Sequence, residues 1–364
     1  MVDIVMKTTY NVHIDRDNQK LLRYRGDVKG VQIYMFQILV DSGANLPAEL
    51  AKKHRIEVLS FINHVDGKNV TCYLPDQTPE EERARGKEFY DSMRNGLTVQ
   101  TGLISIGEFE EAFREVLERG EDVLCLTISS GISGTYNSAR IAAREVAEDF
   151  PERSVRMIDT KNASLAAGIL AIYASEMREQ GKDVNETADW LLKKSGEMNG
   201  VFTVGDLKFL SRTGRITKTS ALIGNTLNIK PILRGDRDGH IVQYKKCHGR
   251  KSAINTLISL LLDNIVDPEN QILGIAHADA YEESLYIMNR ITEKIKVRGF
   301  INTTYDLCTG SHVGPDTIAI FFMGKDRELT GALSGLKQSL LNRTGENLSR
   351  ILSPEHVAAQ RNLQ

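Results

Sequence analysis

The sequence has few cysteines, and none of them falls in a metal-binding or disulfide-forming pattern. Its four cysteines, at positions 72, 125, 247 and 308, lie far apart and form no Cys-x-x-Cys pair. This spacing indicates neither a structural zinc site nor a framework of disulfides. We therefore predict isolated thiols in a reducing, cytoplasmic environment, with no metal and no other cofactor.

An excess of basic residues is also missing. The chain has 46 Lys and Arg residues against 48 Asp and Glu residues, a formal net charge of -2. Nucleic acids and anionic membranes attract strongly basic proteins, so the sequence predicts no nucleic-acid partner. No apolar run approaches the length that crosses a bilayer, and the first twenty residues interleave charged with apolar positions. We therefore expect neither a transmembrane segment nor a signal peptide.

The length and the hydrophobic pattern predict two α/β domains. A chain of 364 residues is long for a single core. Short apolar runs alternate with amphipathic stretches, which indicates a parallel sheet flanked by helices. In the first half we expect strands at 33–40, 56–62, 123–128 and 155–159, and helices at 108–119 and 164–180. After a polar stretch at 193–200, the expected strands are 229–233, 241–245, 272–277 and 317–323.

The segment "SSGISG" at 129–134 stands between an expected strand and a helix that begins near Thr135. Backbone amides at a helix N-terminus, together with the helix dipole, favour an anion, so the segment predicts a phosphate or carboxylate site. The Gly-Lys-Ser/Thr ending of nucleotide-binding phosphate loops is missing. The alternative is structural, because Ser and Gly are common caps in strand-to-helix turns.

Seven motifs in order carry a resemblance to a known family. They are "DSGANLP" (41–47), "ISSGISGTYNSA" (128–139), "DTKNASLAAG" (159–168), "DLKFLSRTGRI" (206–216), "IKPIL" (229–233), "HAD" (277–279) and "GSHVGPDTIAIFFMG" (310–324). The chain resembles DegV-family proteins, the group that includes the FakB-type fatty-acid-binding subunits of bacterial fatty acid kinase. The motifs cover roughly residues 33 to 325.

The resemblance implies a two-domain DegV-like α/β fold with one long-chain fatty acid bound between the domains. The N-terminal domain, 33–197, would hold a parallel, Rossmann-like sheet with flanking helices. The second α/β domain, 198–325, would bind the lipid. Residues 1–32 would form an N-terminal extension, and residues 326–364 a helical C-terminal extension.

The resemblance also implies which residues hold the carboxylate of the fatty acid. They correspond here to Thr101, Ser133 and His312. The supporting positions in the adjoining loops are Ser130, Gly134 and Gly310. Thr101 follows from aligning the family's "TSQPS" segment with "TGLIS" at 101–105, where Gly, Leu and Ile replace Ser, Gln and Pro. The Thr101 hydroxyl is thus retained, although the loop around it differs from the family's.

The resemblance implies a partner as well. In the family, a separate fatty acid kinase subunit phosphorylates the carboxyl group of the bound acid to give an acyl-phosphate. Arg215 and Arg250 would face that kinase or the transferred phosphate, since guanidinium groups bond phosphate oxygens bidentately. His248 stands where the family often has another Arg. The protein would be a lipid-binding accessory subunit and not itself an enzyme.

Two other functions stay open on the sequence. The first is a hydrolase with Ser133 as nucleophile and His312 as base, although Thr135 stands where a nucleophile elbow has its second Gly. The second is a carrier of another amphipathic carboxylate, such as a hydroxylated or isoprenoid acid. The three head-group residues also have structural alternatives: a helix cap for Ser133, a strand edge for Thr101, and a backbone contact within a Gly-Pro-rich loop for His312.

Overall fold

The computed structural model describes residues 36–216 and 228–327. All of them lie within Met35–Gln364, which forms one compact unit. The expected extension at 1–32 lies outside the described residues, as does the C-terminal extension beyond residue 327. The domain boundary expected between residues 197 and 198 stays a prediction. No helix of the described ranges is both long and apolar enough to cross a bilayer.

The first sheet is parallel, as the sequence predicts, with strand order β2-β1-β6-β7. Its strands are β1 (Phe36–Asp41), β2 (Ile56–Leu59), β6 (Asp122–Thr127) and β7 (Val155–Asp159). The accompanying helices are α1 (Ala48–Lys53), α3 (Ile106–Glu118), α4 (Thr135–Asp149), α5 (Leu165–Glu179) and α6 (Val184–Lys194). Strands β1 and β6 are buried along almost their whole length, as expected of a parallel sheet covered on both faces.

The second sheet is mixed, with strand order β10-β9-β8-β13-β11-β12. Its strands are β8 (Met198–Thr203), β9 (Ile229–Gly235), β10 (Ile241–His248), β11 (Ile272–His277), β12 (Gly299–Thr304) and β13 (Ile318–Met323). Only β11 and β12 pair in parallel in this sheet; its other pairs are antiparallel. The sequence pattern missed β12, and it missed β8 because that strand begins inside the polar stretch 193–200.

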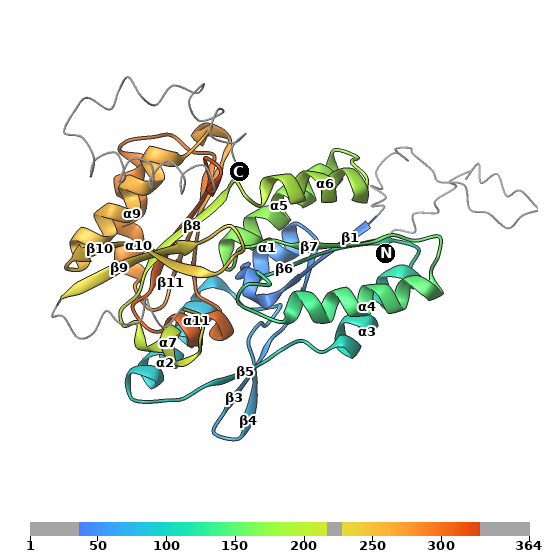
Figure 1. Cartoon of the computed structure of the whole chain (residues 1–364), viewed down its shortest axis with the longest axis horizontal. Helices are drawn as coiled ribbons and strands as arrows, with labels where there is room; N and C mark the ends of the chain where they lie inside the picture. The colour runs from blue at the N-terminus through green and yellow to red at the C-terminus, as the bar shows by residue number, and fades with distance from the viewer. Residues whose placement is uncertain (1–35, 217–227, 328–364) are drawn as a thin grey trace, which may run out of the picture. The chain divides into compact units, whose positions relative to one another are not determined.

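Helix α5 connects the two large sheets. It contacts β1 and β6 of the first sheet and β8, β11 and β13 of the second (Figure 1). Most of its side chains are buried, which explains why it is apolar on nearly all sides. On the other face of the second sheet, α9 (Arg250–Asn264) and α10 (Tyr281–Thr292) enclose a separate apolar core. The start of α5 therefore lies between two sheets.

A third, small antiparallel sheet has strand order β4-β3-β5. Its strands are β3 (Ile62–Val65), β4 (Lys68–Thr71) and β5 (Gln100–Gly102), and the β3–β4 hairpin lies at the lower edge of Figure 1. We expected one strand at 56–62, and this is wrong. The chain leaves the first sheet at the end of β2 and enters the small sheet at the start of β3. Between these two strands the Ser60 hydroxyl accepts hydrogen bonds from the amides of Cys72 and Tyr73, at 3.1 and 3.0 Å.

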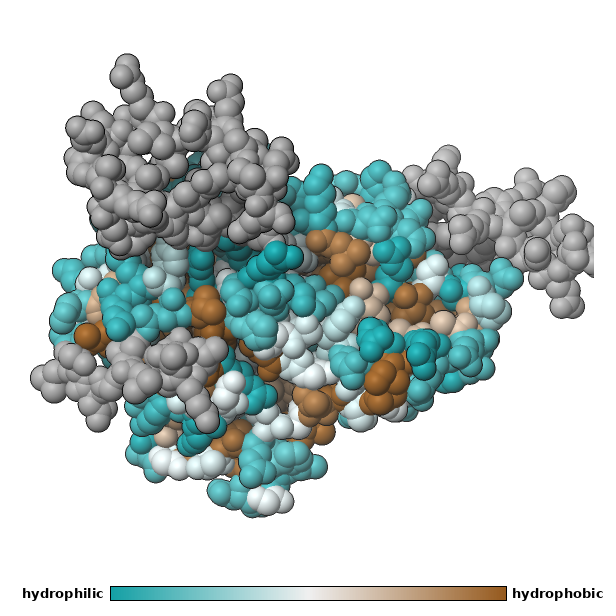
Figure 2. All heavy atoms as spheres, viewed as in Figure 1, coloured by the Kyte–Doolittle hydropathy of each residue, from teal (hydrophilic) through white to brown (hydrophobic). Residues whose placement is uncertain are grey.

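Four short elements and one longer helix complete the described part of the chain. They are the 3-10 turns Ser42–Ala44 and Pro268–Asn270, the short helices α7 (Lys208–Arg212) and α11 (Leu307–Val313), and the longer helix α2 (Pro79–Arg94). Arg94 of α2 donates to Asp279 at 2.5 Å and to Asp316 at 2.6 Å, which fixes α2 to the loops next to β11 and β13. On the face shown in Figure 2, hydrophilic residues predominate and hydrophobic residues gather in small separate areas.

Candidate functional site

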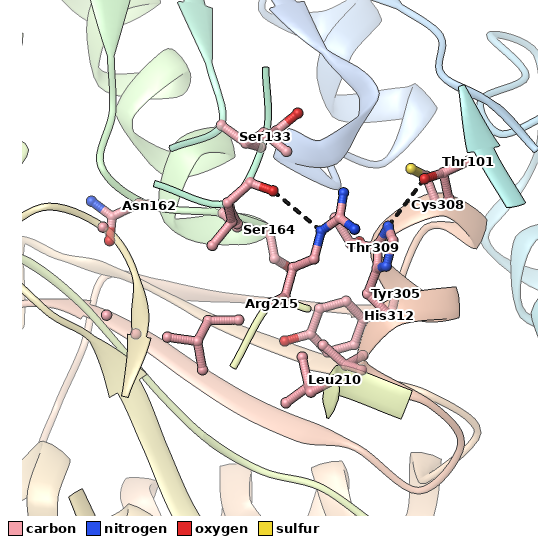
Figure 3. A pocket seen from close by; sticks show the side chains of 18 of the residues that line it. Thr101, Ser133, Asn162, Ser164, Leu210, Arg215, Tyr305, Cys308, Thr309 and His312 are labelled. Carbon is pink, nitrogen blue, oxygen red and sulfur yellow. Dashed lines mark hydrogen bonds between the residues drawn. The ribbon is translucent and has the colours of Figure 1, made fainter. Parts of the chain in front are cut away.

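One largely apolar cavity draws its wall from the second sheet, from the small antiparallel sheet, and from the connections that follow strands β6 and β7 of the first sheet. Its volume is about 110 Å³. Its wall includes Thr101 from β5, Ser133 from the loop before α4, Ser164 from the start of α5, Phe202 from β8, Ile241 from β10 and His312 from α11 (Figure 3). The structure thus brings together the three residues that the sequence predicts as carboxylate ligands.

The side chains of Thr101 and His312 are hydrogen-bonded, with 3.3 Å between Oγ1 and Nε2. We expected His312 in a Gly-Pro-rich loop, and this is wrong: it lies in the last turn of α11. The helix begins early because the Asp306 carboxylate accepts from the amides of Cys308 and Thr309, at 2.9 and 3.1 Å. It ends at Gly314, whose φ of 80° suits glycine.

His312 is neutral near pH 7. Burial, followed by the nearby guanidinium groups of Arg215 and Arg212, lowers the pKa of His312 to about 4. Its Nδ1 is buried and has no hydrogen-bond partner among the described residues. We assign the ring proton to Nε2, because a buried unpaired N–H is less favourable than an unpaired acceptor. In this tautomer Nε2 donates to Thr101, whose own hydroxyl hydrogen is left for another acceptor.

Ser133 lines the cavity and bonds to the first residue of α4. Its Oγ lies 2.8 Å from Thr135 Oγ1 and accepts from the Thr135 amide at 3.3 Å. The structural alternative of a helix cap is not met as stated, because the N-cap residue of α4 is Gly134. A hydroxyl oxygen has two lone pairs and one hydrogen, so the contacts to Thr135 do not exhaust the bonding capacity of Ser133.

The loop amides before α4 are occupied by the protein itself. We expected them to face outward and to bind an anion, and for five of them this is wrong, because the loop turns back on itself and bonds the connection after β7. The bonds run from Ser129 N to Asn162 O (2.7 Å), Ser130 N to Asp159 Oδ1 (3.1 Å), Gly131 N to Ser129 Oγ (3.0 Å), Ile132 N to Ser129 O (3.2 Å) and Ser133 N to Ser129 O (3.1 Å). An anion in the cavity must therefore bond mainly to side chains.

The predicted supporting residues lie beside the cavity. The Ser130 hydroxyl accepts from Lys161 Nζ at 2.9 Å. A Cβ at Gly134 would lie 3.2 Å from Leu103 Cδ1. Gly310 lies inside α11 and not in a loop, and a Cβ there would lie 2.0 Å from the Tyr90 hydroxyl oxygen. Gly310 thus permits close packing of α11 against α2.

The two predicted partner-facing arginines lie in different places. Arg215 lines the cavity, where its guanidinium donates to Ile132 O at 3.3 Å and to Thr213 O at 2.6 Å (Figure 3). Arg250 lies outside the cavity wall and forms an ion pair with Glu283 of α10, with Nε 3.0 Å from Oε1. Arg215 is therefore the arginine whose charge a bound anion would meet.

Residues that the sequence analysis did not select also line the cavity, among them Ser164, Tyr305 and Cys308. All four cysteines are free thiols, as predicted. The Cys308 thiol meets that of Cys72, and this contact, followed by burial, raises the pKa of Cys308. Because Cys72 and Cys308 lie far apart in the chain, no local sequence pattern predicts that they meet.

Over the described ranges, no three His, Cys, Asp or Glu side chains gather as metal ligands.

The fold and the cavity define a class: an α/β protein in which two large sheets and a small antiparallel sheet enclose a mostly apolar cavity with a polar end. The family model described as "Uncharacterised protein, DegV family" matches residues 35–325. The chain belongs to the DegV family.

Individual relatives cover most of the chain. It is 35% identical over 293 residues to a DegV domain-containing protein of Clostridium perfringens, covering 80% of this chain and 99% of that protein. It is 31% identical over 288 residues to a fatty acid-binding protein of Thermotoga maritima, covering 78% and 95%. A solved DegV lipid binding protein of Thermotoga maritima matches with a TM-score of 0.68 at 29% identity, covering 80% of this chain and 99% of that one. DegV, a fatty acid binding protein from Bacillus subtilis, matches with a TM-score of 0.67 at 26% identity, covering 80% and 100%.

Proposed function

We propose that this protein binds a long-chain fatty acid in the cavity, with the carboxylate at Thr101, Ser133 and His312. The observation that carries the proposal is that these three side chains, from separate segments, converge on one mostly apolar cavity. The fatty-acid-binding relatives and solved structures support the same ligand class.

The apolar wall accounts for affinity. Each buried CH₂ contributes roughly 0.8 kcal/mol, so about ten buried methylenes contribute on the order of 8 kcal/mol before the costs of association. Such a tail binds through Phe202, Leu210, Ile241 and similar side chains. The wall favours an acyl chain over a polar substrate.

The carboxylate needs strong partners because a buried unpaired charge is costly. Five loop amides are already bonded, and His312 is neutral, so the positive charge comes from cationic side chains of the wall. Lys161 already forms an ion pair within the protein, which leaves Arg215 as the main source. The hydroxyls of Thr101 and Ser133 add neutral donors. Charge-assisted hydrogen bonds of this kind are about twice as strong as neutral ones.

We further propose that the protein presents this carboxylate to a separate fatty acid kinase for acyl-phosphate formation and is not itself a catalyst. The support is the family resemblance and the position of Arg215 at the head-group end. The hydrolase alternative is not favoured, because Ser133 bonds to Thr135 whereas His312 bonds to Thr101. A nucleophile and its base would be expected to bond to each other.

The test is denaturing extraction of the purified protein, with mass spectrometry of the released acids against a protein-free control. We expect a near-equimolar fatty acid. Adding a bacterial fatty acid kinase catalytic subunit, ATP and hydroxylamine should then give the acyl hydroxamate. An empty extract from protein that also takes up no added fatty acid would overturn the binding proposal. Binding without hydroxamate would overturn only the kinase step, and ester turnover lost in Ser133→Ala would favour the hydrolase.

A further inference from the structure

Ser164 lines the cavity with a hydroxyl that the protein leaves unused. It is the N-cap residue of α5, but its side chain makes no capping hydrogen bond. Only 2% of the residue is exposed, and Oγ has no hydrogen-bond partner among the described residues. Ser at an N-cap normally accepts a bond from an amide of the first turn. A buried hydroxyl without such a bond is unfavourable unless a ligand or a water molecule pairs with it.

The backbone around Ser164 explains why the hydroxyl does not cap the helix. Its φ is 56° and its ψ is -149°, a conformation that glycine adopts readily and serine rarely. The Ser164 amide donates to Gly43 O at 2.7 Å, and its carbonyl accepts from the amides of Ala167 and Gly168, at 2.9 and 3.3 Å. These bonds hold the strained conformation. Strain of this kind is concentrated at sites that bind ligands.

Tyr305 places a second hydroxyl next to the first. It lines the same cavity, is 5% exposed, and its phenol contacts the Ser164 side chain (Figure 3). Its backbone is fixed, because the Tyr305 amide donates to His277 O at 2.9 Å and its carbonyl accepts from Tyr90 at 2.8 Å. Burial raises the pKa of Tyr305, so the phenol keeps its proton and stays a donor.

These two hydroxyls come from different elements than the head-group residues. Ser164 begins α5 and Tyr305 follows β12, whereas Thr101 lies in β5 and His312 in α11. An unsubstituted methylene chain that passes Ser164 and Tyr305 leaves each hydroxyl only the other to interact with. A hydroxyl on the chain can both donate and accept there. A site that hydrogen-bonds a ligand hydroxyl discriminates strongly against the analogue that lacks it.

We propose that the cavity prefers fatty acids that carry a hydroxyl group on the acyl chain, recognised by Ser164 and Tyr305. The inference rests on the proposed function, since it assumes that a fatty acid occupies the cavity. It differs from that function in naming the class of acyl chain and a second polar subsite.

The first experiment compares dissociation constants of stearate, 10-hydroxystearate and 12-hydroxystearate, by displacement of a fluorescent fatty acid from the delipidated full chain. We expect at least one hydroxystearate to bind about tenfold more tightly than stearate. Stearate binding equal to or tighter than both would overturn the inference and leave the proposed function standing. Failure of all three acids to bind would overturn both.

Two variants test the assignment to residues. Ser164→Gly removes the hydroxyl and suits the backbone conformation, and Tyr305→Phe removes the phenol oxygen alone. Each should abolish the preference for hydroxystearate, so that the ratio of the stearate to the hydroxystearate dissociation constant falls from about ten to about one. Tyr286→Phe is the matched control, because Tyr286 lies on α10, is 38% exposed and does not line the cavity. An equal weakening of stearate and hydroxystearate in both variants would overturn the inference, since the hydroxyls would then serve every ligand alike.

Discussion

Thr101 Oγ1 lies 3.3 Å from His312 Nε2, although the two residues are 211 positions apart in the chain. The hydrogen bond joins the small antiparallel sheet to helix α11. The proposed head-group site therefore exists only when β5 and α11 are both in place, and it cannot form within one local segment. Substitutions at either end should act on the ligand more than on the core.

His312→Ala and Ser133→Ala should each weaken fatty acid binding by roughly tenfold or more. Ser133→Ala removes a hydroxyl donor to the carboxylate, and His312→Ala removes the N–H that holds the Thr101 hydroxyl in place to donate to it. The measurement is isothermal titration with stearate. His248→Ala, at an exposed position away from the cavity, is the control and should bind like the wild type. Wild-type affinity in both test variants would refute the site assignment.

Arg215→Gln should lower fatty acid affinity, whereas Arg250→Gln should leave it unchanged, since Arg250 is paired with Glu283. Arg215→Gln should also raise the pKa of His312, because Arg215 is the largest cause of its lowering after burial. Titration of the His312 ring by NMR measures the second effect. A pKa that stays near 4, or falls further, would contradict the proximity of the two charges.

Gly310→Ala should destabilise the protein by about 1–3 kcal/mol, since its Cβ would lie 2.0 Å from the Tyr90 hydroxyl oxygen. Gly107→Ala is the matched helical control. It lies in α3, where a Cβ meets nothing within 4 Å, and it should stabilise the chain by up to about 1 kcal/mol. Urea unfolding compares the two. Equal effects would mean that α11 and α2 are not packed as described.

Leu103→Ser should speed the dissociation of a bound fatty acid several-fold, while Leu192→Ser should not. Both leucines are 54% exposed, but only Leu103 lines the cavity. Its side chain lies against Gly134 and covers apolar wall that a shorter, polar side chain would leave to water. Stopped-flow release of a fluorescent fatty acid measures the rate. The same rate in both variants would remove Leu103 from the site.

Asp41→Asn should change how stability depends on pH. Burial is the main cause that raises the pKa of Asp41 to about 7, so between about pH 4 and 7 the folded chain holds a proton that the unfolded chain has released. Raising the pH through this window therefore lowers the free energy of unfolding of the wild type. The variant lacks this contribution and can still accept from the Ile128 amide, which lies 2.8 Å from the wild-type carboxylate.

Urea unfolding at pH 5 and pH 8 is the measurement for Asp41→Asn. The free energy of unfolding of the variant minus that of the wild type should be larger at pH 8 than at pH 5. The exposed Asp149→Asn serves as the control. A difference between Asp41→Asn and the wild type that is the same at both pH values, or that reverses, would show that Asp41 is ionised in the folded chain throughout.

Local patterns predicted most of the parallel sheet, whereas the head-group residues follow from the family resemblance and stay a prediction. The strand at 155–159 is confirmed without change as β7, because a short apolar run bounded by polar residues fixes its ends. Strand β12, with the sequence "GFINTT", carries three polar residues and gave no such signal. Strand β8 begins at Met198, inside a stretch that looks like a polar linker.

What the sequence could not predict depends on contacts between distant segments. The loop amides looked available to an anion, but Ser130 N bonds to Asp159 at the end of the neighbouring strand β7. The contact between Cys72 and Cys308, and the convergence of Ser164 with Tyr305, likewise have no local pattern. Ser164 stands in a motif that carried the family resemblance, and only the three-dimensional structure gives its hydroxyl a place in the cavity wall.

Helix α5 touches both large sheets, and its N-cap residue Ser164 belongs to the cavity wall. A lipid in the cavity would therefore complete a core that the empty chain leaves open. A ligand that binds only the folded chain adds about 2.7 kcal/mol to the free energy of unfolding at one hundred times its dissociation constant. Proteases act on unfolded copies, so unloaded molecules would be degraded first. The abundance of the protein would then follow the supply of its lipid.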